Sequence, residues 1–226
     1  MNAPRPTAQT ERTTAYRYPE RVTYDREDAY AILDEALCVH VGFTTEDGPF
    51  VIPSLHTREG NQLILHGSAH GRFVKTVSSG APVCVTATLI DGLILGRAAS
   101  HHSAAYRSVM VFGTATPVED AAERAEYLAR VVESVVPGRL SASNAARRPS
   151  VEEAAYTAIM TMPIDEFSIK VRAGFARDEP KDDGVEAWAG TIPLTTTPGT
   201  PVPDTLTGTR FPAPVYDPAI HRFRQN

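Results

Sequence analysis

The sequence has few cysteines, no long hydrophobic run and no excess of positive charge. Two cysteines in 226 residues do not form a disulfide framework. Cys38 and Cys84 lie in apolar runs and are expected as free thiols, with a bridge between them as the alternative. No run approaches the roughly 18 apolar residues of a membrane span, and the first residues lack a signal peptide's apolar core, so we expect a cytoplasmic protein. The net charge of −5 argues against broad binding to nucleic acid or anionic membranes.

Several motifs of nucleotide binding and catalysis are also missing. There is no Gly-x-Gly-x-x-Gly and no Gly-x-x-x-x-Gly-Lys-Ser/Thr, so the two standard ways to hold a dinucleotide or a nucleoside triphosphate are absent. No Ser-His-Asp or Cys-His signature indicates a nucleophile. No Cys or carboxylate pattern completes a metal site around the histidines, so none is predicted.

The distribution of apolar residues predicts three parts. Residues 1–20 are rich in Thr, Pro and Arg and form a flexible arm, residues 21–192 form one domain, and residues 193–226 form an extended Pro/Thr-rich tail. Helices are predicted over 25–37, with Asp25 as N-cap, and over 69–79, 119–136 and 151–160. Strands are predicted over 38–44, 50–56, 62–66, 82–89, 93–98, 106–116 and 163–172, with a tight Asp91-Gly92 hairpin between the fourth and the fifth.

Short strands joined by tight turns, with few helices between them, favour an antiparallel barrel. We expect it to be closed or partly closed, with the helices packed outside. Pro53 cannot donate a ladder hydrogen bond, so its strand should lie at a sheet edge or carry a bulge there.

Residues 65–77 have the pattern of a phosphate-binding segment. A strand ends there, a small polar turn with Ser68 follows, and the next helix carries Arg72 and Lys75 on one face. Helix N-terminal amides, a hydroxyl and two cations can converge on one anion. The same pattern also describes an ordinary capped helix with a solvated basic face.

A second polar cluster, residues 100–108, stands directly before an apolar strand. It combines the adjacent histidines His101 and His102 with several hydroxyl groups. Burying such groups unpaired costs roughly 1–3 kcal/mol each, so this density is typical of a face that meets a ligand or a partner chain. A polar loop in water is the alternative.

Together these motifs resemble the pyridoxamine 5′-phosphate oxidase-like superfamily of FMN-binding split β-barrels, in the branch that includes nitroimidazole-resistance proteins. The likeness spans about residues 20–194 and is carried by segments 51–53, 65–72, 102–113 and 185–190. It implies a mainly β (α+β) domain, a six-stranded antiparallel split β-barrel with peripheral helices. It also implies a homodimer with FMN in a groove at the interface.

The resemblance implies roles for individual residues. Arg72, Lys75 and Ser68 would hold the FMN phosphate, and the backbone of 52–54 would run beside the isoalloxazine ring. The expected cofactor-binding residues are Ile52, Pro53, Ser54, His66, Gly67, Ser68, Arg72, Lys75, Ser103, Tyr106, Ser108 and Trp188. Ser103, Tyr106 and Ser108 resemble the family's contacts from the partner subunit, and Trp188 matches a tryptophan near the flavin, with a plain core role as the alternative.

Because imidazole titrates near neutral pH, His66 and His102 are the candidates for proton transfer at the substrate. A structural hydrogen-bonding role is the alternative for each. The expected function is thus an FMN-dependent oxidoreductase that transfers hydride between the flavin and a small organic substrate. Thr191-Ile192-Pro193-Leu194 stands where the oxidases carry arginine motifs for the substrate phosphate, so vitamin B6 oxidation is not expected.

Two other classes of function remain open. The first is a carrier or sensor that binds flavin or haem without turnover, since split barrels also hold haem and deazaflavin. Its candidate iron ligands are His66, His70, His101 and His102. The second is an interaction protein with a vestigial groove.

Overall fold

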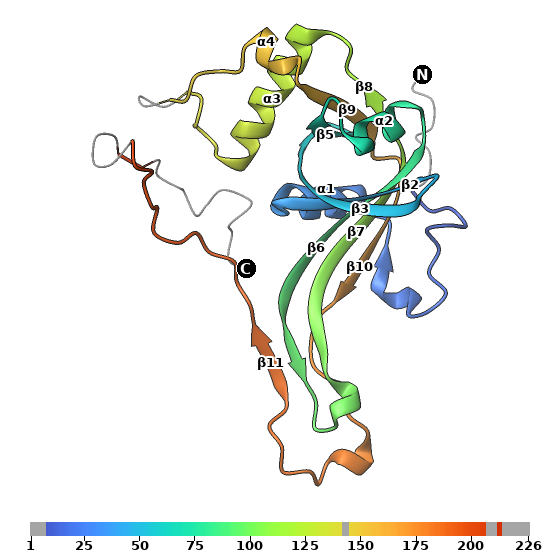
Figure 1. The fold of residues 1–226 in the computed structure, drawn as a ribbon. Coiled ribbons are helices and arrows are strands. Elements are labelled where there is room, and N and C mark those ends of the chain that lie inside the picture. The colour runs from blue at the N-terminus through green and yellow to red at the C-terminus, as the bar shows by residue number, and fades with distance from the viewer. Residues whose placement is uncertain (1–7, 142–144, 207–211, 214–226) are drawn as a thin grey trace.

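The computed structural model describes residues 8–141, 145–206 and 212–213, which form two antiparallel sheets with helices around them (Figure 1). The strands are β1 Val22–Thr23, β2 Cys38–Thr45, β3 Gly48–Leu55, β4 Thr57–Glu59, β5 Gln62–Ser68, β6 Pro82–Leu95, β7 Ser103–Thr114, β8 Thr116–Pro117, β9 Thr157–Pro163, β10 Glu166–Arg172 and β11 Gly190–Pro193. The helices are α1 Arg26–Glu35, α2 Arg72–Ser78, α3 Ala121–Val135 and α4 Val151–Ala154, with 3₁₀ turns at Pro19–Arg21, Ala99–His101 and Pro180–Asp182.

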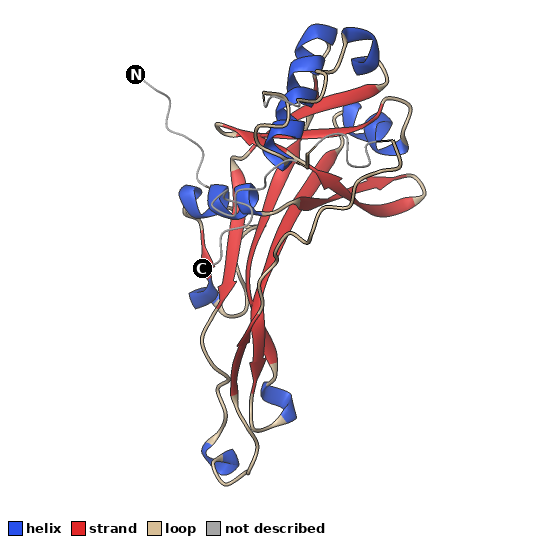
Figure 2. Ribbon diagram, turned by 90° about the vertical axis from the view of Figure 1, so that its left-hand side faces the viewer, coloured by secondary structure: helices blue, strands red, loops and turns tan. Residues whose placement is uncertain are grey.

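The long ribbon of β6 and β7 runs through the middle of the larger sheet. That sheet has the order β1-β10-β7-β6-β2-β3, with β11 also paired to β6, and the smaller sheet has the order β4-β5-β9-β8. Buried side chains from both sheets, such as Val85 and Leu65, form one core with α1 and α2. The predicted fold class, a mainly β split barrel with peripheral helices, is confirmed. Away from this core, β6 and β7 extend as a long arm (Figure 2).

Helix α1 begins where the sequence predicts. The carboxylate of Asp25 accepts hydrogen bonds from the backbone N–H groups of Glu27 and Asp28 at 2.9 and 3.1 Å. These groups have no acceptor inside the helix, so the cap fixes its first turn. Ile32 and Leu33 on the inner face are buried, as their spacing predicts.

Asp25→Ala is expected to lower the free energy of unfolding by about 0.5–2 kcal/mol, because both capped N–H groups lose their acceptor. Urea unfolding followed by circular dichroism measures this change. Asp47→Ala, at an exposed turn between β2 and β3, is the matched control and should change stability by less than about 0.5 kcal/mol. Equal losses in the two variants would contradict the capping role.

The predicted hairpin at Asp91-Gly92 is wrong. β6 continues through this dipeptide, and the turn into β7 contains Ala99–His101. The register of β6 against β7 shifts between Ile90 and Gly92, which marks a bulge. A Cβ on Gly92 would stand 2.8 Å from the carbonyl oxygen of Ile192 in β11. The glycine therefore allows a strand to approach closely instead of forming a turn.

The predicted helix over 151–160 is wrong in its second half. α4 ends at Ala154, and β9 then pairs with β5 from Thr157 opposite Ser68 to Pro163 opposite Gln62. Pairing along the whole strand, with the inner side chains of β9 buried in the core, outweighs the weak local preference for a helix.

The N-terminal end of the described chain contacts the domain, and the C-terminal segment is tied to it through β11. In the predicted N-terminal arm Ala8 is buried, while Thr10 and Arg12 donate hydrogen bonds to the carboxylate of Glu166 on β10. The predicted tail begins inside β11, and residues 194–206 continue without a helix or a strand. The rest of these two predicted segments, residues 1–7, 207–211 and 214–226, lies outside the described residues.

Cys38 and Cys84 are free thiols. No helix in the described ranges is long and apolar enough to cross a membrane. Within those ranges no group of three or more His, Cys, Asp or Glu side chains is placed to hold a metal ion.

Candidate functional site

A cavity of about 430 Å³ lies where the edge of the larger sheet faces the smaller sheet. Its walls come from β3, the end of β5, the start of α2 and the start of β9. The lining residues are Ile52, Pro53, Ser54, Leu55, His66, Gly67, Ser68, Gly71, Phe73, Val74 and Thr157. The fold thus brings together segments 52–54 and 66–68, both predicted to bind the cofactor, although they belong to different sheets.

β3 can offer its backbone to a ligand because it is the last strand of its sheet. Pro53 stands opposite His40 of β2, so its position on an edge strand is confirmed, as expected for a residue without an N–H donor. The side chain of Ser54 is buried, and its hydroxyl donates to the Leu55 carbonyl at 2.8 Å. The wall formed by β3 is therefore mainly backbone and apolar surface.

β5 and α2 pack closely behind the cavity. A Cβ on Gly67 would lie 3.1 Å from Val74 and 3.2 Å from Phe73, so the glycine lets the helix approach the strand. α2 begins three residues later than predicted, because β5 continues to Ser68. Gly71 is the N-cap and supplies no side-chain cap, which leaves the first-turn amides without a side-chain acceptor.

Arg72 and Lys75 stand on α2 beside the lining residues Phe73 and Val74, although neither of the two is itself among the residues that line the cavity. Both are exposed, and neither forms an ion pair with a carboxylate of the described residues. The Arg72 guanidinium lies 4.5 Å from the centroid of the Phe50 ring on β3, and this cation–π contact keeps it near the β3 side. By contrast, Arg58 and Arg107 are both paired with carboxylates. Arg72 and Lys75 therefore keep their charges available for an anion.

His66 is half-buried in the cavity wall, and its Nδ1 is buried without a hydrogen-bond partner among the described residues. Burial lowers the pKa of His66, an effect that the Leu55 carbonyl opposes in part. The ring is therefore neutral at physiological pH. An unsatisfied ring nitrogen in a cavity wall is suited to a hydrogen bond with a ligand.

The remaining predicted residues lie on the arm and do not line this cavity. Ser103, Tyr106 and Ser108 belong to β7, His102 precedes it, and Trp188, which is 64% exposed, precedes β11. A single chain therefore does not bring these residues together with segments 52–54 and 66–68.

His101, at the tip of the arm, is held by an acidic side chain. Its Nδ1 lies 3.1 Å from the Asp178 carboxylate, which also accepts a hydrogen bond from the backbone N–H of Arg97 at 2.9 Å. The Arg97 N–H is the main reason that the pKa of Asp178 is below its usual range. A Cβ on Gly96 would stand 2.6 Å from the same carboxylate, so this contact also depends on a glycine.

Comparison with known proteins matches the part of the chain that contains the first cavity. A family model for pyridoxamine 5′-phosphate oxidase matches residues 25–171, from the N-cap of α1 to the last residue but one of β10. The chain belongs to this family. The resemblance predicted from the motifs is thereby confirmed. A search of curated proteins gives no match.

Two solved structures related to this family member cover most of it. The flavocytochrome Anf3 of Azotobacter vinelandii is 35% identical, with 96% of this chain and 98% of that chain covered and a TM-score of 0.81. An FAD- and haem-binding protein of Mycobacterium smegmatis is 30% identical, with 85% and 94% covered and a TM-score of 0.77. A candidate 5-nitroimidazole antibiotic resistance protein of Bacteroides thetaiotaomicron, at 22% identity, 66% and 86% coverage and a TM-score of 0.56, shares the fold.

Three residues that line the first cavity are not predicted from the sequence, namely Phe73, Val74 and Thr157. Thr157 lines the cavity from β9. It is not predicted because residues 151–160 are expected to form a helix, although the β-branched residues within 157–161 favour a strand. Phe73 and Val74 line the cavity because α2 packs against Gly67, a contact between elements that helix spacing alone does not specify.

His66 should resist protonation in the folded protein. Its pKa is depressed by burial, whereas in the unfolded chain it has the ordinary value of about 6.5, so the unfolded state binds the proton first as pH falls. The stability that depends on neutral His66 is present above about pH 6.5 and declines as pH falls toward the folded-state pKa. NMR should show His66 titrating at lower pH in the folded than in the urea-unfolded protein. His66→Gln should lose less stability in acid than the wild type, and equal losses would contradict this account.

Proposed function

We propose that this chain is a flavin-dependent oxidoreductase that binds FMN in the cavity between β3, β5 and α2. The reaction is hydride transfer between the flavin and a small organic substrate. The observation that carries the proposal is the position of Arg72 and Lys75, two exposed cations without a carboxylate partner among the described residues, on the helix whose Phe73 and Val74 line that cavity. A phosphate dianion is bound well by such a pair and needs no dinucleotide motif. Two relatives at 30% identity or more, a flavocytochrome and an FAD- and haem-binding protein, support a flavin.

The residues around the cavity fit an FMN molecule chemically. Arg72, Lys75 and the hydroxyl of Ser68 would hold the phosphate, and the backbone at Pro53 and Ser54 would face the ring. The buried, unpartnered Nδ1 of His66 supplies a hydrogen bond to the ring or to the substrate. When bound, a flavin supplies the hydride chemistry, and the protein supplies position and an environment with little water.

Haem as an additional cofactor is favoured by a specific observation, because both of these relatives are named for haem or cytochrome. Of the predicted iron ligands, His101 is engaged by Asp178, whereas His70 and His102 are exposed. Nδ1 of His102 lies 3.2 Å from the Ala98 carbonyl, which orients the ring and leaves Nε2 for a metal. With haem, the chain would act as an electron carrier or sensor.

We also propose that the chain is a homodimer. Large apolar side chains are exposed on β3, on β6 and β7 and around β11, namely Val51, Leu55, Leu93, Met110, Trp188 and Ile192. A second copy would cover such a surface, and would carry Ser103, Tyr106 and Ser108 toward its partner's cavity. Sedimentation velocity should give twice the chain mass, and a monomer at micromolar concentration would refute the dimer.

Purified protein tests the cofactor directly. We expect a yellow protein with the visible spectrum of a flavin, and mass spectrometry of the released molecule should give the mass of FMN. The mass of FAD or a deazaflavin would change the assignment of the cofactor, and a Soret band lost in His70→Ala or His102→Ala would establish haem. Colourless protein whose melting temperature does not rise with added FMN would refute flavin binding.

A further inference from the structure

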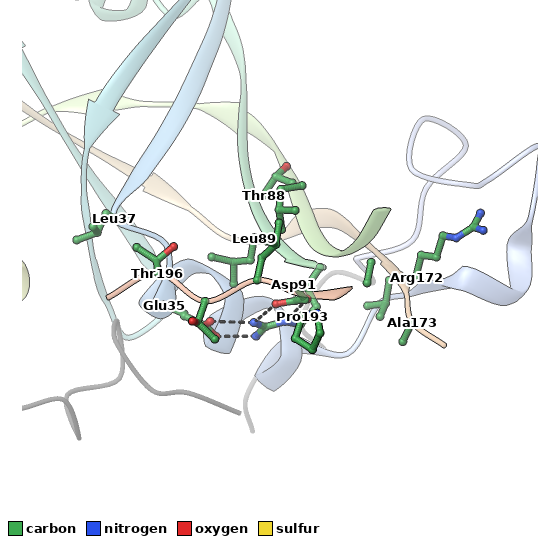
Figure 3. Close-up of a pocket in the computed structure, with 15 residues that line it drawn as sticks. Glu35, Leu37, Thr88, Leu89, Asp91, Arg172, Ala173, Pro193 and Thr196 are labelled. Carbon is green, nitrogen blue, oxygen red and sulfur yellow. Dashed lines mark hydrogen bonds and ion pairs between the residues drawn. The ribbon is translucent and has the colours of Figure 1, made fainter. Parts of the chain in front are cut away.

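A second cavity, of about 610 Å³, lies where β6 changes its neighbour. β2 pairs with β6 at residues 83–86 and β11 pairs with it at 92–95, so the edge between these stretches faces an open space (Figure 3). The end of α1, β7, the end of β10 and the segment after β11 surround it. The lining residues are Glu35, Leu37, Thr88, Leu89, Ile90, Asp91, Ala105, Arg107, Val171, Arg172, Ala173, Pro193, Leu194, Thr195 and Thr196, none of which lines the first cavity.

A cluster of three charged side chains, Glu35, Asp91 and Arg107, lies in the wall of this cavity, to which three threonines add hydroxyl groups. Arg107 donates to Glu35 through Nη1 and Nη2 at 2.6 and 2.8 Å, and to Asp91 through Nε and Nη2 at 3.0 and 2.7 Å (Figure 3). Two carboxylates and one guanidinium leave one net negative charge. Arg172 also lines the cavity, but its side chain points away from the labelled Glu35 and Asp91.

The cluster can accept hydrogen bonds from a ligand but has hardly any N–H group left to donate one. Arg107 already uses four of its five N–H groups on the two carboxylates. Glu35 and Asp91 keep lone pairs free, and their side chains are 24% and 35% exposed. At this cluster an anionic ligand would meet a net negative charge, because Arg172 points away from it, whereas an ammonium group could donate to both carboxylates.

The other walls are largely apolar. Leu89, Val171 and Leu194 contribute hydrophobic surface, and the Leu194 N–H donates to the Asp91 carbonyl at 3.0 Å, which ties the segment after β11 to the cavity. The volume is within the range of about 300–1,000 Å³ found for small-molecule sites. No His, Cys, Met or Tyr is among the lining residues, so the cavity does not supply the axial ligands that haem iron usually has.

We propose that this cavity binds a small organic cation, an ammonium group on an apolar body. The ammonium group lies at Glu35 and Asp91, and the apolar body packs against Leu89, Val171 and Leu194. The site is independent of the proposed flavin cavity, with which it shares no residue.

Isothermal titration calorimetry with three probes of similar shape tests the charge preference on the purified protein. Phenethylammonium is the cation, 2-phenylethanol the neutral probe and 3-phenylpropanoate the anion. We expect the cation to bind about tenfold or more tightly than the alcohol, as one charge-assisted contact predicts, and the anion to show no binding. Equal affinities for all three probes, or no binding of the cation at millimolar concentration, would overturn the proposal.

Two variants locate the binding. Glu35→Gln should weaken phenethylammonium binding about tenfold, and Ala105→Leu should abolish it by filling the space next to a buried alanine. Asp34 is also on α1, but it pairs with Arg58 of β4 and does not line the cavity. Asp34→Asn breaks this comparable ion pair and should leave binding unchanged. Equal weakening by Glu35→Gln and Asp34→Asn would refute this site. The wild-type comparison of probes holds even if a variant fails to fold, and flavin content measured in each sample separates this result from the proposed function.

Discussion

Arg72→Ala combined with Lys75→Ala should nearly abolish flavin retention while the fold survives. Each residue is expected to make a charge-assisted contact with the phosphate worth about 1.5–3 kcal/mol. Their combined loss, about 3–6 kcal/mol, weakens binding by more than about 100-fold. Both side chains are exposed on α2, so the substitutions remove charge without opening the core. The ratio of flavin to protein absorbance in purified samples, and titration of the apoprotein with FMN, measure the effect.

A matched control separates this local effect from a general loss of positive charge. Arg130→Ala combined with Arg148→Ala also removes two cations, but these are paired with Glu59 and Glu126, away from the cavity. Flavin content should stay at the wild-type level in this control. If the Arg72/Lys75 variant also retains its flavin, the phosphate is bound elsewhere and the proposed orientation of the cofactor is wrong.

Phe167→Ala should cause the largest loss of stability among these variants. Phe167 is completely buried on β10, where it contributes to the core between the sheets, and the Arg26 guanidinium lies 5.4 Å from its ring centroid. Truncating a buried phenylalanine removes hydrophobic burial and leaves a cavity, at a cost of about 3–5 kcal/mol. Because domains are stable by about 5–15 kcal/mol in total, the urea midpoint should fall sharply.

Phe175→Ala provides the matched control for this loss. Phe175 lies in the loop after β10 and is 75% exposed, so its truncation should change the free energy of unfolding by less than about 0.5 kcal/mol. A small loss in Phe167→Ala, comparable to that of the control, would mean that the core relaxes around the missing ring or that β10 packs differently.

The sequence predicts elements that are specified by their own residues. α1 has an Asp25 cap and a buried face with helical spacing, and both are seen in the structure. The apolar spacing of 119–136 likewise predicts α3 to within two residues of each end. Pro53 carries information about its surroundings as well, because a residue without an N–H donor is restricted to an edge strand.

Elements that depend on distant partners are not predicted. β9 is a strand because it pairs with β5, almost a hundred positions earlier in the chain, and Asp91-Gly92 is a bulge because β11 lies against it. The first cavity has the same dependence. The resemblance names segments 52–54 and 66–68, but only the fold places them side by side and adds Thr157 from β9.

The close approach of β11 to Gly92 protects one edge of β6 from aggregation with other copies of the chain. β11 occupies the outer hydrogen-bonding positions of β6 at residues 92–95. A chain that stopped before Gly190 would present those amide and carbonyl groups bare, and a bare strand edge recruits strands from other molecules. The short strand β11 therefore protects the edge of β6 from pairing with other molecules, and the absence of a side chain at Gly92 allows β11 to come close enough to form this pairing.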